Sequence, residues 1–166
     1  MASNYLEELI AQWYEFRGYF VRRNVLVGKR PKGGYECELD IVAFHPAQQH
    51  LVHLEPSMDA HTWEVRERRF AAKFAAGRRH IPGLFKGFSV PKEIEQIAVL
   101  GFASVHHHRM IGGGRILHIA ELLEEIFCEL RGKRIASSAI PEHLSILRSF
   151  QFVAEYHKVV SRALGA

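Results

Sequence analysis

The stretches Glu38-Leu-Asp-Ile-Val-Ala-Phe44 and His50-Leu-Val-His-Leu-Glu-Pro56 decide the fold of this chain. Both are apolar runs of strand length, and the polar segment between them, His45-Pro-Ala-Gln-Gln49, predicts a turn. The two runs therefore form a β-hairpin. If the turn is centred between Ala47 and Gln48, residues whose numbers sum to 95 face each other across it.

This register places two acids side by side. Three facing pairs follow from it: Phe44 with Leu51, Val42 with His53, and Asp40 with Glu55. Like charges directly opposite each other repel, and either a shared proton or a bound cation relieves the repulsion. A hard divalent cation held by carboxylate oxygens is the interpretation with chemical consequences. A shift of the register by two would put Glu38 in the place of Asp40.

Apolar residues on both faces of the hairpin predict helices on both sides of its sheet. One face is expected to carry Leu39, Ile41, Ala43, Val52 and Leu54, and the other Val42, Phe44 and Leu51 beside the acids. Periodicity and breaker residues extend this pattern along the chain. They predict a helix over 4–17 with Ser3 or Asn4 as its N-cap, strands over 19–28, 35–44, 50–56 and 95–103, and helices over 61–79 and 120–131. They also predict a short strand over 115–119 and a terminal helix, either continuous or broken, from 141 to about 164.

The segments Gly33-Gly-Tyr-Glu-Cys-Glu-Leu-Asp-Ile-Val-Ala43 and Leu51-Val-His-Leu-Glu55 resemble the core of the PD-(D/E)xK nuclease superfamily. The similarity is greatest to its Holliday-junction-resolvase-like and small restriction-endonuclease-like members, and it covers roughly residues 4–80. It implies an α/β, restriction-endonuclease-like three-layer helix–sheet–helix core with a mixed sheet. It also implies a metal-dependent nuclease that hydrolyses DNA phosphodiester bonds.

The resemblance assigns roles to particular residues. Asp40 and Glu55 would bind Mg²⁺ or Mn²⁺, and Glu7 on the first helix would complete the shell through a water, with Glu8 as a substitute. The superfamily's motif lysine, however, is Ser57 here, in Glu55-Pro-Ser57. A serine hydroxyl carries no charge and cannot stabilise a phosphate electrostatically as lysine does. We expect a basic group from the second helix to replace it, with Lys73, Arg69 and Arg66 as the candidates. Pro56 lacks a backbone donor, which predicts that the strand ends there or lies at a sheet edge.

Basic residues cluster in the half of the chain that carries the acidic pair. The clusters are Arg22-Arg23, Lys29 to Lys32, Arg66 to Lys73, and Arg78 to His80. Lys and Arg around an acidic centre suit a phosphodiesterase, because they contact backbone phosphates. Lys29, Arg30, Lys32, Arg66 and Arg69 are therefore the expected nucleic-acid-binding residues, although each cluster taken alone also fits a solvated surface. The net charge of +4 permits DNA as a partner without requiring it.

Composition limits the other function classes. At 166 residues and 48% hydrophobic, the chain fits a core over 1–132 with a helical extension over 133–166 that packs on the core or on a partner. No apolar run approaches the roughly 18 residues of a membrane helix, and no signal-peptide pattern is present. Cys37 and Cys128 lack metal-ligand spacing, as do the consecutive histidines 106–108. We expect a cytoplasmic protein with reduced cysteines and no membrane partner. A homodimer is also compatible with the resemblance, because cutting both DNA strands needs two sites.

Two other interpretations remain open at this stage. The missing lysine favours a catalytically degenerate protein of the same fold, which binds nucleic acid or serves as a partner subunit without cleaving. Alternatively, the chain is an unrelated α/β domain in which both acids are structural. The first predicts salt-dependent DNA binding without cleavage. The second predicts neither metal affinity nor DNA binding.

Overall fold

A computed structural model of the chain describes residues 5–102 and 108–165. The proposed N-cap residues Ser3 and Asn4 lie outside this part. The helices are α1 (Tyr5–Phe16), α2 (Trp63–His80), the 3₁₀ turn η1 (Ile81–Leu84), α3 (Ile119–Leu130), α4 (Ile135–Ser138), α5 (Ser145–Glu155) and α6 (His157–Leu164). The strands are β1 (Phe20–Lys29), β2 (Tyr35–His45), β3 (His50–Ser57), β4 (Glu95–Leu100), β5 (Met110–Ile111) and β6 (Gly114–His118).

The six strands form one mixed sheet in the order β1-β2-β3-β4-β6-β5. The first three strands pair antiparallel as a meander, and β4 is parallel to both β3 and β6. A parallel neighbour requires a crossover, and α2 supplies it between β3 and β4. The predicted α/β class is therefore confirmed, and the order α1-β1-β2-β3-α2-β4 agrees with the sequence prediction.

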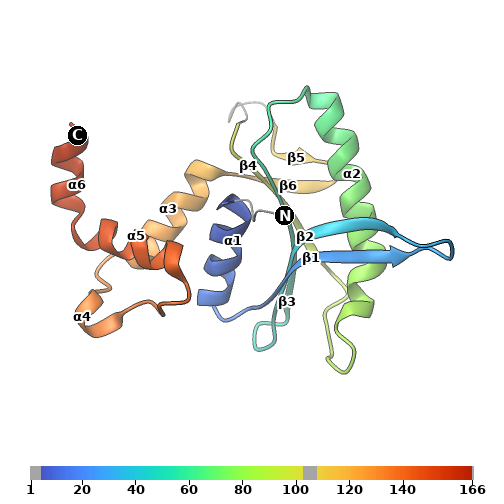
Figure 1. The fold of residues 1–166 in the computed structure, drawn as a ribbon, viewed down its shortest axis with the longest axis horizontal. Coiled ribbons are helices and arrows are strands. Elements are labelled where there is room, and N and C mark those ends of the chain that lie inside the picture. Colours follow the sequence, from blue (N-terminus) through green and yellow to red (C-terminus); the bar gives the residue numbers. More distant parts are fainter. Residues whose placement is uncertain (1–4, 103–107, 166) are drawn as a thin grey trace.

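Helices cover both faces of the sheet, as the doubly apolar strands predicted (Figure 1). On one face, α1, α3 and α5 pack against Ile41, Ala43, Val52 and Leu54. On the other face, α2 contributes Phe70, Phe74 and Ala76. The long β1–β2 hairpin extends beyond the sheet on the α2 side, and α6 lies at the opposite end of the molecule (Figure 1).

The register of the β2–β3 hairpin is the one expected from its turn. Phe44 pairs with Leu51 and Val42 with His53, so the residue numbers sum to 95 throughout the ladder, which runs from Ile41–Leu54 to His45–His50. Asp40 is the next residue along, and Glu55 follows Leu54. The two-residue slip that would have placed Glu38 opposite Glu55 does not occur.

Pro56 does not end its strand, contrary to the sequence prediction. Strand β3 continues to Ser57 and lies inside the sheet, between β2 and β4. The Ser57 carbonyl accepts a hydrogen bond from Gly101, just beyond β4. Backbone groups of successive strand residues point to opposite sides, so those of Pro56 point toward β2, whose ladder with β3 stops at Leu54. A missing N–H is tolerated there.

Leu39 also departs from the expected pattern. It packs with Val42 and Phe44 on the α2 face rather than with Ile41 and Ala43. On β1, Asn24 lies between the residues that pair with Ile41 and Leu39, and it has a left-handed φ of 50°. Asparagine tolerates this conformation better than most residues. The simple alternation of faces is therefore broken at the point where Asp40 lies.

The C-terminal third packs against the rest of the same chain. Ile140, Leu144 and Leu147 join the core formed by α1 and α3. The predicted terminal helix is broken at Tyr156 into α5 and α6, and α6 has no buried residue. No helix in the described ranges is both long enough and apolar enough to cross a membrane.

Candidate active site

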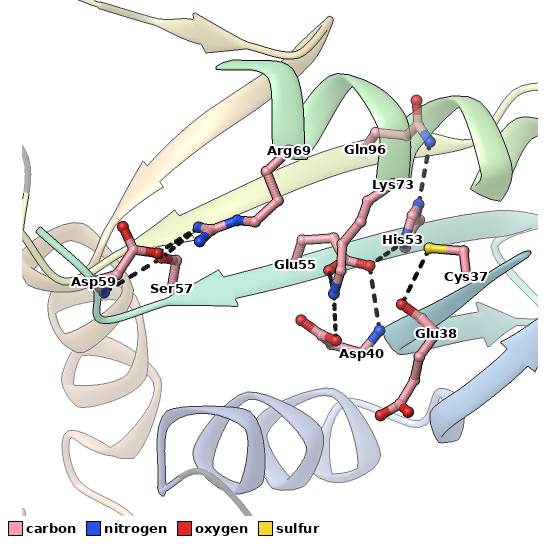
Figure 2. Close-up of polar contacts among 10 residues, drawn as sticks. All are labelled: Cys37, Glu38, Asp40, His53, Glu55, Ser57, Asp59, Arg69, Lys73 and Gln96. Carbon is pink, nitrogen blue, oxygen red and sulfur yellow. Dashed lines mark hydrogen bonds and ion pairs between the residues drawn. The ribbon is translucent and has the colours of Figure 1, made fainter. Parts of the chain in front are cut away.

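Asp40, Glu55 and Lys73 meet where the described ladder between β2 and β3 ends (Figure 2). The Lys73 Nζ atom lies 2.6 Å from Asp40 Oδ1 and also contacts Glu55 Oε2. The backbone N–H of Asp40 donates to Glu55 Oε1 at 3.2 Å. Glu55 is 1% exposed, so its charge is almost fully withdrawn from water. Three charged groups from two strands and a helix thus share one site.

The site opens into a cleft of about 450 Å³. The polar side chains that line it are Asp40, Glu55, Ser57, Asp59, Arg69 and Lys73. Pro56, Met58 and Phe70 supply the apolar part of the lining. The cleft therefore combines acidic oxygens with two basic groups, at a size that fits a small anionic group together with a cation.

Both acids lie in surroundings that disfavour their ionised forms. Burial and the neighbouring Glu55 raise the pKa of Asp40 from 3.8 to about 7. Burial also raises the pKa of Glu55, although Lys73 and hydrogen bonds from Asp40 oppose this effect. Desolvation disfavours the charged form of a carboxyl group, and a like charge nearby adds to this. The sequence anticipated a shared proton or a cation here, and a cation of the chain itself, Lys73, already contacts both carboxylates.

Lys73 reaches the acids from α2, one of the sources predicted for the missing basic group. It lies one turn after Arg69 and on the same helix face, since residues four apart are neighbours on a helix. Burial alone would lower the pKa of Lys73, but Glu55 and Asp40 outweigh it and raise that pKa. The ammonium group therefore stays charged at neutral pH.

Ser57, where the resemblance to the PD-(D/E)xK nucleases would place a lysine, belongs to a second polar group in the same cleft. Arg69 Nη2 donates to Ser57 Oγ at 2.9 Å and lies 2.5 Å from Asp59 Oδ2. Burial would raise the pKa of Asp59, but hydrogen bonds from Ser57 and Arg69 outweigh it and lower the pKa to about 2. Asp59 is therefore ionised at neutral pH and holds Arg69 at the edge of the cleft (Figure 2).

The predicted phosphate-contacting residues lie in three different places. Lys29, Arg30 and Lys32 are exposed at the tip of the β1–β2 hairpin. Arg69 lines the cleft with its side chain 38% exposed. Arg66, in contrast, is buried and donates to the Phe102 carbonyl at 2.9 Å, so its guanidinium does not lie on the surface.

Glu7 lies in the first turn of α1 and is half-buried. Its role as a water-mediated ligand stays a prediction. Within residues 5–102 and 108–165, no group of three or more His, Cys, Asp or Glu side chains is arranged to hold a metal ion. His106 and His107 lie outside the described residues, while His108 stacks on Trp63 at 3.8 Å between ring centroids.

Sequence reasoning missed three residues that surround the acids. Asp59 follows β3, and no motif in the sequence pointed to it. The hairpin register places His53 opposite Val42, but it does not predict the hydrogen bonds of His53 to Gln96 and Glu55. A signal for Gln96 was available, because it is a polar residue inside a predicted buried strand, immediately before the apolar run Ile97-Ala-Val-Leu100.

No protein-family model matches this chain, and no significant similarity to a curated protein or to a solved structure was found.

Proposed function

We propose that this chain is a divalent-metal-dependent nuclease of restriction-endonuclease-like fold that hydrolyses DNA phosphodiester bonds. The observation that carries the proposal is the convergence of Asp40, Glu55 and Lys73 in one cleft. Two acids and a lysine are the groups that the PD-(D/E)xK resemblance calls for. The element order α1-β1-β2-β3-α2-β4 is also the order that the resemblance implies.

The donor set fits a hard divalent cation. Asp40 and Glu55 offer carboxylate oxygens, the preferred ligands of Mg²⁺ and Mn²⁺. Burial and the neighbouring Glu55 disfavour the ionised form of Asp40, and a bound cation would offset the repulsion between the two carboxylates. Asp40 and Glu55 would hold the ion, with Glu7 completing the shell through a water. When bound, such an ion lowers the pKa of its water and stabilises negative charge on the scissile phosphate.

Lys73 takes the electrostatic role of the missing motif lysine in this proposal. Its ammonium lies at the acids although it comes from α2 rather than from β3. A charge held inside a partly desolvated cleft stabilises a developing anion more strongly than one in bulk water. Arg69 at the cleft edge, together with the exposed Lys29, Arg30 and Lys32, would position the DNA backbone.

The alternative is a binding protein of the same fold that does not cleave. One contact favours it: Lys73 already bridges both carboxylates, so the chain neutralises its own acidic pair. If Lys73 cannot move aside, the cation site is closed. Affinity for DNA would remain and would weaken with salt in the ordinary way.

A cleavage assay separates these two functions. Linear duplex, single-stranded and four-way-junction DNA are incubated with the protein and Mg²⁺ or Mn²⁺, beside the variants Asp40→Asn and Lys73→Met. Lys86→Met is the matched control, because Lys86 is an exposed lysine outside the cleft. We expect metal-dependent cutting that Asp40→Asn abolishes, that Lys73→Met reduces by roughly 10²-fold or more, and that Lys86→Met leaves unchanged.

Three other results would contradict the proposal. Cutting that survives Asp40→Asn would show that the assigned site is wrong. A folded wild-type protein that shifts DNA but does not cut it with either metal would support the binding protein instead. A protein that neither cuts nor binds DNA would refute both.

A further inference from the structure

The two oxygens of the Glu55 carboxylate have different surroundings. Oε1 accepts the backbone N–H of Asp40 at 3.2 Å and lies 2.7 Å from His53 Nε2. Oε2 instead contacts Lys73, which lines the cleft. One oxygen is thus tied to the protein interior, and the other is presented to the cleft (Figure 2).

The neighbours of His53 define which of its ring nitrogens carries the proton. Gln96 Nε2 lies 2.8 Å from the Phe74 carbonyl, which can only accept, and Arg78 donates to Gln96 Oε1. These two contacts fix the orientation of the Gln96 amide. Its NH₂ group therefore donates to His53 Nδ1 at 3.1 Å. Nδ1 is then the acceptor, and the proton sits on Nε2, which donates to Glu55 Oε1.

The His53 ring is also fixed by packing. It is fully buried, and the ring of Phe74 meets it edge to face, with 5.4 Å between the centroids. Gly77 provides the space that the ring needs: a Cβ at this position would lie 2.3 Å from His53 Nδ1. Buried donors and acceptors that are all satisfied hold one arrangement rigidly.

We propose that His53 and Gln96 are positioning residues that hold Glu55 in one orientation, with Oε2 directed at the cation site. The inference rests on the proposed function, since the cation is part of that proposal. Residues behind a ligand typically affect metal affinity by about 10- to 100-fold because they orient the ligand and fix its tautomer. The chain from Gln96 through His53 to Glu55 has this form.

The test has two readouts on the full chain. The first is the ¹⁵N NMR signature of the His53 ring in metal-free protein, which we expect to show a proton on Nε2 and none on Nδ1. The second is the affinity for Mn²⁺ measured by calorimetry. We expect His53→Leu to weaken Mn²⁺ binding by roughly 10-fold or more. His53→Gln, whose amide can donate to Oε1, should restore part of the loss.

Val52→Ala is the matched control, because Val52 is the buried neighbour of His53 on β3 and faces the opposite side of the sheet. It should lower stability and leave Mn²⁺ affinity unchanged. Equal loss of Mn²⁺ affinity in Val52→Ala and His53→Leu would overturn the inference, as would a proton on Nδ1. A wild-type protein that shows the Nε2 proton but binds no Mn²⁺ would refute the metal site of the proposed function and still support the arrangement of His53 and Gln96.

Discussion

Asp40 differs from an ordinary surface aspartate because it is largely buried beside a second acid. Its side chain is 17% exposed, and its nearest cation is Lys73 at 2.6 Å. An acid placed this way is unfavourable for folding whenever it is ionised, since both burial and the Glu55 charge oppose ionisation. Natural chains keep such residues mainly where function needs them. The position of Asp40 therefore has a measurable effect on stability.

The variant Asp40→Asn should be more stable than the wild type at high pH. The folded-state pKa of Asp40 is raised from 3.8 to about 7, so the folded protein holds a proton that the unfolded chain has released. Wild-type stability should therefore fall as pH rises from about 4 to 7. Above this window, we expect the free energy of unfolding of the variant to exceed that of the wild type by on the order of 2 kcal/mol. Each pKa unit is worth about 1.4 kcal/mol, but the variant also loses the ion pair with Lys73, which reduces its gain.

Urea unfolding of metal-free protein checks this effect. The free energy of unfolding is compared for the wild type and Asp40→Asn at about pH 4 and about pH 8, because the difference should appear only at the higher pH. Glu121→Gln, at a half-buried glutamate on α3 outside the cleft, serves as a control. A constant difference between wild type and Asp40→Asn at both pH values would show that Asp40 titrates normally.

At the scale of the element, a glycine of α2 allows the helix to pack closely against the residues behind the site. Gly77 is buried in the last turn of α2, against His53 and Gln96. At an exposed helix position, replacing glycine with alanine adds up to about 1 kcal/mol of stability. At Gly77 the new Cβ would lie 2.3 Å from a buried ring that cannot rotate away.

We therefore expect Gly77→Ala to destabilise the protein by about 1–3 kcal/mol, against the trend of helix propensity. Ala72→Gly, at an exposed position of the same helix, should cost about 1 kcal/mol through propensity alone. Thermal unfolding of both variants gives the comparison. A Gly77→Ala protein as stable as the wild type would mean that the His53 ring has room to move.

The start of α5 depends on a side chain from α1. Leu144, the residue before α5, supplies no side-chain cap. Gln12, which is 2% exposed, takes its place: its Oε1 accepts the N–H of Ile146 at 2.9 Å and that of Leu147 at 3.3 Å. These are donors that a helix N-terminus leaves unsatisfied. Gln12 thus joins the C-terminal third to the core.

Gln12→Met keeps the size of this side chain and removes the acceptor. We expect it to lower the free energy of unfolding by about 1–2 kcal/mol, the typical loss of an N-cap. Amide hydrogen exchange at Ile146 and Leu147 should speed up more than exchange elsewhere. Ser149→Ala, on the exposed side of α5, is the control and should change neither. Unaltered exchange at Ile146 in Gln12→Met would mean that the α5 cap is replaceable.

The local sequence pattern was enough to predict most helices and strands. It did not predict the features that depend on contacts between residues far apart in the sequence. The hairpin register was predictable because both strands are apolar and their turn is short and polar. The fate of Pro56 was not, since it depends on where the ladder to β2 stops. The change of face at Leu39 occurs opposite the left-handed residue Asn24 of β1, which the pattern of β2 alone does not indicate.

Some residues of the candidate site were also predictable from local pattern, and others were not. That Asp40 and Glu55 lie close together followed from the hairpin alone. Lys73 could be named as one of three candidates because it lies on the predicted helix, but its choice over Arg66 needed the packing of α2. Arg66 is buried there, whereas Lys73 points at the acids. Gln12 and Gln96 act across more than 40 residues of sequence, a range that periodicity does not reach.

At the scale of the whole molecule, positive charge is distributed unevenly. The net charge of +4 is modest. Lys29, Arg30 and Lys32 are nevertheless gathered on the projecting tip of the β1–β2 hairpin, far from α6 (Figure 1). Their side chains are exposed, so they contribute little to stability. A projecting basic hairpin is suited to contact the phosphates of a polymer that extends beyond the cleft.

We expect replacement of Lys29, Arg30 and Lys32 together by alanine to weaken DNA binding uniformly across sequences. The slope of log affinity against log salt should fall by up to about 3, since each lost phosphate contact removes about 0.9. Replacement of Arg131, Lys158 and Arg162, which are exposed at the other end of the molecule, removes the same charge and is the control. Fluorescence anisotropy with labelled duplex DNA over a salt series measures both. Equal slopes in the two triple variants would show that net charge, rather than the hairpin, governs binding. Long-range attraction depends on the total charge of the protein, whereas counterion release depends on the number of individual phosphate contacts.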